Sequence, residues 1–145
     1  MTKHLTVNRT LSDKAMDHID HALGRPLDPL GETYRNHFAI HDDSDQAAEF
    51  RASPYWSCTR DFCGMVYFHV TQEGRRALSA HLKEIGDPHK SFIVKFEYCG
   101  EADSATVVAA KASEAKYRRW LEVTDLSDLM TFKEFCKTAS VRRAA

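Results

Sequence analysis

A chain of 145 residues, 43% hydrophobic and 28% charged, has the composition of a folded globular protein and not of a disordered one. Its formal net charge of -1 argues against a protein that coats nucleic acid through overall charge. The longest apolar runs are far shorter than the ~20 residues of a membrane span, so no membrane partner is expected. The first residues lack the apolar core of a signal peptide and the four cysteines are scattered, which predicts reduced thiols in a cytoplasmic, host-cell protein.

Hydrophobic periodicity and capping residues predict six elements in the first half of the chain. These are, in order, a helix over 13–23, a short strand over 34–40, a helix over 44–51, two hairpin strands over 55–58 and 65–70, and a helix over 71–85. Ser12 is expected to cap the first helix and Gly24 to end it. The polar residues of 17–21 are expected to lie on the solvated side of that helix.

The transition from the second hairpin strand to the last of these helices is the most informative segment. Val66, Phe68 and Val70 alternate with polar or exposed positions, and Thr71 stands where an N-cap belongs. This strand-to-helix corner is typical of a winged-helix domain, in which the hairpin forms the wing. Residues 1–86 therefore predict a winged-helix-like part.

The segment from Gly86 to His89 is the best candidate boundary between two parts. Beyond it, strands over 91–99 and 105–110 precede a helix that Ser113 is expected to cap and a second helix with a capping box at Thr131. A short basic tail follows. The fold class is therefore α+β, with a winged-helix-like helix/hairpin/helix part packed against a ββαα part (87–145), which we expect to form one compact unit.

Two pairs of potential metal ligands occur at a spacing of four or five residues. They are Cys58 with Cys63, and His37 with His41. Structural zinc sites have two closely spaced ligand pairs, and this arrangement is an imperfect version of one, so buried thiols and surface histidines are the favoured interpretation. His37, His41 and Asp43 also define a further alternative, a small metal-dependent hydrolase. No catalytic residue is assigned, and no cofactor is expected.

Nucleic-acid binding is an alternative function that follows from the wing. In a winged helix the wing and its neighbouring helices contact phosphates, which makes Arg60, Arg75 and Arg76 candidates. Arg118 and Arg119 in the second part are candidates for a separate basic patch. The helix over 44–51 has the position of a recognition helix but contains three acidic or amide residues and one arginine, so it would repel phosphate.

Two segments resemble known proteins. The run Tyr34-Arg35-Asn36-His37-Phe38, followed by Phe68-His69-Val70-Thr71 and Gly74-Arg75-Arg76-Ala77-Leu78, resembles small uncharacterised accessory proteins of tailed phages and prophages. The segments 115–120, 132–135 and 140–143 are similar to a basic C-terminal module of such proteins. The resemblance covers about two thirds of the chain and implies a context, a phage or prophage accessory protein, without an activity.

The sequence therefore favours a non-enzymatic phage or prophage accessory protein that binds a host or phage macromolecule. Inhibition of a bacterial defence system is a candidate role. Trp56, Phe62 and Tyr67 are the candidate partner-binding aromatic residues, with core packing as the competing explanation for each. A winged-helix nucleic-acid-binding regulator is the alternative from another functional class.

Overall fold

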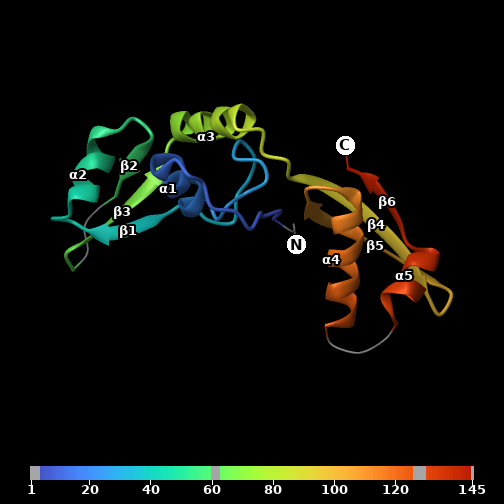
Figure 1. Cartoon of the computed structure of the whole chain (residues 1–145). Coiled ribbons are helices and arrows are strands. Elements are labelled where there is room, and N and C mark those ends of the chain that lie inside the picture. The colour runs from blue at the N-terminus through green and yellow to red at the C-terminus, as the bar shows by residue number, and fades with distance from the viewer. Residues whose placement is uncertain (1–3, 60–62, 126–129, 145) are drawn as a thin grey trace. The chain divides into compact units, whose positions relative to one another are not determined.

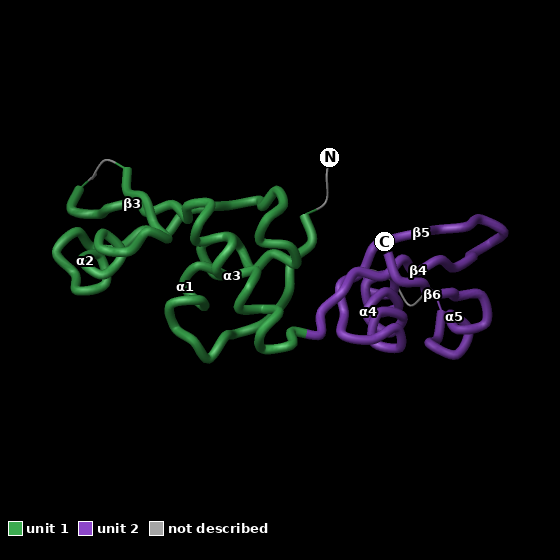
Figure 2. Tube along the Cα trace, turned by 90° about the horizontal axis from the view of Figure 1, so that it is seen from above, with its two compact units in different colours: residues 1–87 green, residues 88–145 purple. Residues whose placement is uncertain are grey.

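The computed structural model describes residues 4–59, 63–125 and 130–144. By its internal contacts the chain divides into two compact units, residues 1–87 and residues 88–145 (Figure 2). The mixed α+β class predicted from the sequence is confirmed, because five helices and two three-stranded antiparallel sheets lie within the described residues (Figure 1).

The first unit contains six elements around one sheet. They are α1 (Lys14–Ala22), β1 (Phe38–His41), α2 (Asp45–Ala52), β2 (Trp56–Cys58), β3 (Met65–Val70) and α3 (Gln72–Glu84). The hairpin is confirmed, with Trp56 opposite Val70, and β3 lies in the middle of the sheet order β1-β3-β2. The winged-helix detail is not confirmed: a helix-turn-helix needs two consecutive helices, and the described residues between β1 and β2 form α2 alone.

Local capping sets the helix ends. Asp13, one residue later than expected, caps α1 by accepting a hydrogen bond from the Met16 amide. At the other end the Gly24 and Arg25 amides donate to the carbonyls of His21 and Asp20, the bond pair of a Schellman motif. Gly24 has a φ of 81°, the left-handed conformation that this motif requires at its first residue after the helix.

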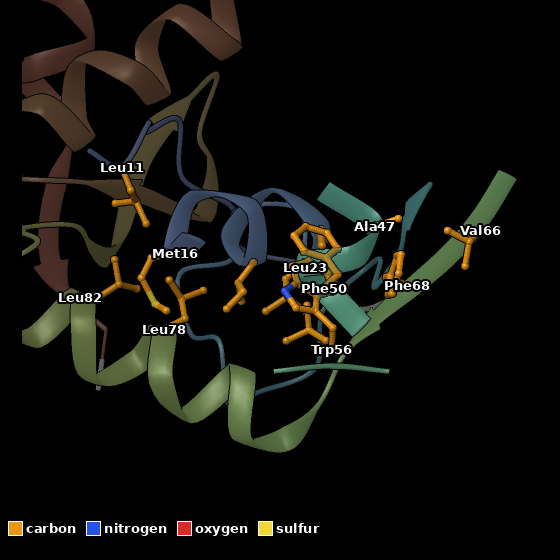
Figure 3. Packing of buried hydrophobic residues seen from close by; sticks show 13 residues of the cluster. Leu11, Met16, Leu23, Ala47, Phe50, Trp56, Val66, Phe68, Leu78 and Leu82 are labelled. Carbon is orange, nitrogen blue, oxygen red and sulfur yellow. The ribbon is translucent and has the colours of Figure 1, made fainter. Parts of the chain in front are cut away.

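The core of the first unit joins α1, α3 and the sheet. Leu11 and Met16 lie with Leu78 and Leu82 between α1 and α3 (Figure 3). A second group is aromatic. Its members are Phe38, Phe50, Trp56 and Phe68, and the rings of Phe50 and Trp56 are stacked with centroids 4.1 Å apart.

The second unit has one more strand than the sequence predicted. Its elements are β4 (Lys90–Tyr98), β5 (Glu101–Ala109), α4 (Ala112–Thr124), α5 (Phe132–Thr138) and β6 (Ser140–Arg143). The expected basic tail pairs with β4 as β6, with Val141 opposite Val94, so the part is ββααβ and not ββαα. The alternation of Val141 with exposed neighbours is too short to identify a strand in advance.

The sheet of the second unit packs against α4 and α5 through Phe92, Val94, Phe96 and Phe135. Thr131 caps α5 as predicted, while Ser113 lies inside α4 instead of capping it. Among the described residues no helix has the length and apolarity that crossing a membrane would require.

Candidate functional site

Arg75 does not lie where a phosphate contact needs it. Its guanidinium donates to the carbonyls of Pro29 and Gly31 at 3.0 and 3.1 Å and to the Thr33 hydroxyl at 3.2 Å. Burial lowers the pKa of Arg75. The side chain therefore joins the loop before β1 to α3, and its role in nucleic-acid binding stays a prediction.

The other predicted arginines divide into paired and exposed ones. Arg118 pairs with Glu114 at 2.7 Å. Arg119 bonds Asp103 and Glu122 at 2.6 and 3.0 Å. Arg76 is exposed on α3, and Arg60 lies outside the described residues. Arg75 and Arg76 belong to the first unit and Arg118 and Arg119 to the second, so no single unit gathers the predicted basic surface.

The predicted partner-binding aromatic residues differ in their exposure. Trp56 is 8% exposed and belongs to the aromatic core, so its proposed role at an interface is wrong and core packing explains it. Tyr67 is 37% exposed and lies opposite Ala39 on the outer face of the sheet. Phe62 lies outside the described residues.

The predicted metal ligands are not brought together. In the sheet, Cys58 pairs with Phe68 and His41 pairs with Met65. Phe68 and Met65 are separated by an odd number of positions on β3, so Cys58 and His41 lie on opposite faces of the sheet. Cys58 and Cys63 are exposed free thiols, and His37 is exposed at the start of β1. Across the described residues no three His, Cys, Asp or Glu side chains are grouped closely enough for a metal ion. The hydrolase hypothesis centred on His37, His41 and Asp43 therefore has no metal site among the described residues.

What the first unit does bring together is a buried ionic network at α1. Asp20 is completely buried and accepts two hydrogen bonds from Arg9, at 2.6 and 3.0 Å. Arg9 also reaches Asp87 at 3.0 Å. The expectation that the polar residues of 17–21 are solvated is wrong for Asp20, because the segment before α1 folds back over it.

Arg25 completes this network from the far end of the helix. Its Nη1 lies 2.7 Å from Asp17 and 3.1 Å from Asp20, which leaves Nε and Nη2 outside these two ion pairs. The hydrogen bond from Arg25 lowers the pKa of Asp17. Arg25 has a φ of 53°, in the left-handed region, and its side chain reaches Asp17 on α1.

Beside this network lies a pocket of about 250 Å³, which we call the Arg25–Arg35 pocket. It is lined by Thr6, Val7, Asn8, His21, Gly24, Arg25, Tyr34 and Arg35. The packing at Gly24 is close: a Cβ there would lie 2.2 Å from the ring of Tyr34 and 3.0 Å from Cγ of Arg35. Glycine is therefore required both by the helix end and by the wall of the pocket.

Arg35 is one of two arginines, with Arg119, whose Nε is buried without a hydrogen-bond partner among the described residues. The Nη2 of Arg35 donates to the His37 carbonyl at 3.0 Å. Native structures leave few buried donors unpaired, and each one calls for an explanation. The side chain of the adjacent Asn36 is engaged at both its amide nitrogen and its carbonyl oxygen, since it exchanges two hydrogen bonds with the backbone of Val70.

Two cationic side chains line the pocket, of which Arg25 is paired with Asp17 and Asp20. Burial, together with the charges of Arg35 and Arg25, lowers the pKa of His21, whose ring also packs edge-on against Phe38. None of the described lining residues is acidic. The arrangement presents hydrogen-bond donors on two guanidinium groups, a phenol and an amide, which suits an anion.

Sequence reasoning missed most of this site. Arg9, Asp20 and Arg25 are 5 to 16 residues apart, and only the fold-back of residues 4–9 onto α1 joins them. The available signal was the pair Gly24-Arg25 followed by Tyr34-Arg35.

Comparison of the chain with protein-family models, with curated proteins and with solved structures found no match.

Proposed function

We propose that this chain is a non-enzymatic binding protein that recognises an anionic group in the Arg25–Arg35 pocket. The observations that carry this proposal are a pocket lined by Arg25 and Arg35 and by no carboxylate, and a buried Nε of Arg35 without a hydrogen-bond partner among the described residues. A buried donor without a partner costs about 1–3 kcal/mol, and an anionic acceptor beside it recovers that free energy.

The chemistry of the lining supports binding over catalysis. The described lining contains His21, Tyr34 and Thr6 but no Ser, Cys, Asp or Glu that would complete a nucleophile–base or acid–base pair with them. The resemblance to accessory proteins of tailed phages and prophages supports the same interpretation and adds a context, in which the anion belongs to a host or phage partner. Inhibition of a defence system is the corresponding role in that context.

Binding along a nucleic-acid backbone has less support. Arg75, Arg118 and Arg119 are already engaged within the protein, and the overall charge is close to zero. A protein that follows a phosphate backbone needs several free cationic side chains on one surface.

The test is the thermal unfolding of the chain in phosphate and in chloride at equal ionic strength. Phosphate stabilises proteins generally by exclusion from their surface, and specific binding adds to this effect. Arg35→Gln is expected to lose the specific increment in Tm, while the matched variant Arg76→Gln, on an exposed α3 residue, keeps it. An equal phosphate increment in all three proteins would contradict the proposal.

A further inference from the structure

We infer that the anion recognised by the Arg25–Arg35 pocket is the 5′-phosphate of a nucleoside, either free or at the end of a strand. This inference rests on the proposed function and specifies its ligand class. Three features of the surface around the pocket lead to it: its size, an aromatic side chain in its wall, and an acidic pocket beside it.

The first feature is size. The Arg25–Arg35 pocket measures about 250 Å³, several times the ~30 Å³ that one water molecule occupies, so it is larger than an inorganic anion requires. A second pocket of about 240 Å³ is lined by residues adjacent in sequence to the first set, such as Leu5 beside Thr6 and Pro26 beside Arg25. Each volume lies just below the range of roughly 300–1,000 Å³ that is usual for small-molecule sites.

The second feature is the ring of Tyr34. It lies close to Gly24 and is 57% exposed, so part of an aromatic surface is accessible beside Arg25 and Arg35. The His4 ring lies 6.3 Å from it, centroid to centroid, and connects it to the second pocket. A nucleobase stacks on such a surface whatever its identity, because every base has a π-face.

The third feature is the charge of the second pocket, which we call the His4 pocket. Asp28 and Glu32 line it, so it offers hydrogen-bond acceptors where the Arg25–Arg35 pocket offers donors. Ribose hydroxyls and base amino groups are donors. A nucleotide carries acceptors on its phosphate, a stacking surface on its base, and donors on its ribose hydroxyls and base amino groups, which correspond to the donor pocket, the aromatic ring and the acceptor pocket.

Recognition of one phosphate also agrees with the charge of the chain. A net charge of -1 is unfavourable for contacts along a backbone but does not oppose a single buried phosphate contact. The shared chemistry of a free nucleotide and a strand end is the same 5′-phosphorylated nucleoside, and the experiment below separates the two sources.

The experiment measures dissociation constants by NMR titration at constant ionic strength for AMP, ribose 5-phosphate, adenosine and inorganic phosphate. AMP is expected to bind roughly 5- to 100-fold more tightly than ribose 5-phosphate, the range of a single base-stacking contact. Adenosine is expected to bind at least tenfold more weakly than AMP because it lacks the phosphate.

Variants assign these differences to residues. Tyr34→Leu is expected to remove the advantage of AMP over ribose 5-phosphate while leaving inorganic phosphate binding unchanged. Arg35→Gln is expected to weaken every phosphorylated ligand at least tenfold, and Arg76→Gln none of them. Glu32→Gln, on an exposed residue of the His4 pocket, is expected to weaken AMP but not inorganic phosphate.

Whether the bound phosphate belongs to a free nucleotide or to a strand end is tested with a short single-stranded oligonucleotide that carries either a 5′-phosphate or a 5′-hydroxyl. Arg35-dependent binding of only the phosphorylated strand supports a strand end, and binding of AMP without the strand supports a free nucleotide. If AMP binds no more tightly than inorganic phosphate and both require Arg35, the inference is overturned and the proposed function stands. If no anion binds the wild-type protein, both are overturned.

Discussion

The buried carboxylate of Asp20 is the residue on which the architecture around α1 depends most. Its two oxygens neutralise Arg9 and Arg25, which come from segments on either side of the helix. Removing one partner of a buried ion pair leaves the other charge uncompensated in a medium of low dielectric constant. A surface pair has no such penalty, since water screens it.

Asp20→Asn is therefore expected to lower the free energy of unfolding of the first unit by about 3–5 kcal/mol. The matched control is Asp42→Asn, in the exposed ion pair with Arg51, which is expected to cost at most about 1 kcal/mol. Urea denaturation in a Trp120→Phe background measures both, because Trp56 in the core of the first unit then reports alone. Equal losses in the two variants would show that the Asp20 network contributes no more than a surface pair.

His21 links stability to pH. Its pKa is lowered in the folded protein, first by burial and then by Arg35 and Arg25, while Asp17 opposes the shift. Between the folded pKa and the unfolded value near 6.5, the unfolded chain binds more protons, so stability rises with pH in this window. The contribution is present above about pH 6.5 and is lost as the pH falls below it.

His21→Gln is accordingly expected to show a smaller loss of stability than the wild-type chain when the pH is lowered from 7.5 to 5. Urea denaturation at several pH values measures the two slopes. Parallel slopes would mean that His21 does not titrate differently in the folded and unfolded chains.

At the scale of elements, the end of α1 is the device that builds the pocket. Gly24→Ala forces a Cβ into the ring of Tyr34 and also places alanine at a φ of 81°. Gly86→Ala imposes a similar backbone penalty at a φ of 68°, with no atom of the described residues within 4 Å of the new Cβ. Each variant is expected to lose about 1 kcal/mol from the backbone conformation.

Only Gly24→Ala is expected to lose phosphate binding as well, because Tyr34 and Arg35 must move away from the new methyl group. Thermal unfolding with and without phosphate measures both properties on the same samples. Retention of the phosphate effect in Gly24→Ala would show that phosphate binding does not depend on the conformation at the end of α1.

The strand β6 is the element that the sequence did not predict. Val141 packs against the core of the second unit, whereas Arg142 next to it is exposed. Val141→Asp is expected to cost about 1–3 kcal/mol because it places a carboxylate on that core, and Arg142→Asp to change stability by less than about 0.5 kcal/mol. Denaturation followed by Trp120 fluorescence in a Trp56→Phe background tests this, and equal effects would show that β6 does not contribute to the core.

At the scale of the whole molecule, the structural features set by neighbouring residues could be predicted from the sequence. Contacts between distant segments could not. The hairpin and the caps at Thr71 and Thr131 follow from residues adjacent in sequence, and the structure contains them. The pairing of β6 with β4 joins segments more than forty residues apart, and no local pattern encodes such a contact.

In the candidate site, too, the sequence identifies individual residues but not which of them come together. Tyr34 and Arg35 are adjacent in sequence, but their proximity to Gly24 comes from the packing of the loop on the end of α1. Trp56 and Arg75 were assigned to surfaces because of residue type, while burial and hydrogen bonding place them in the structural framework. Residue type alone does not distinguish an arginine that binds a ligand from one that fastens a loop.

The most direct test of the central claim is an amide NMR titration of the wild-type chain with inorganic phosphate, using chloride at equal ionic strength as the reference. Anion binding in the Arg25–Arg35 pocket predicts saturable shifts concentrated at the amides of Gly24, Arg25, Tyr34 and Arg35, and their loss in Arg35→Gln. Shifts spread over both units without saturation, or unchanged in Arg35→Gln, would contradict the account.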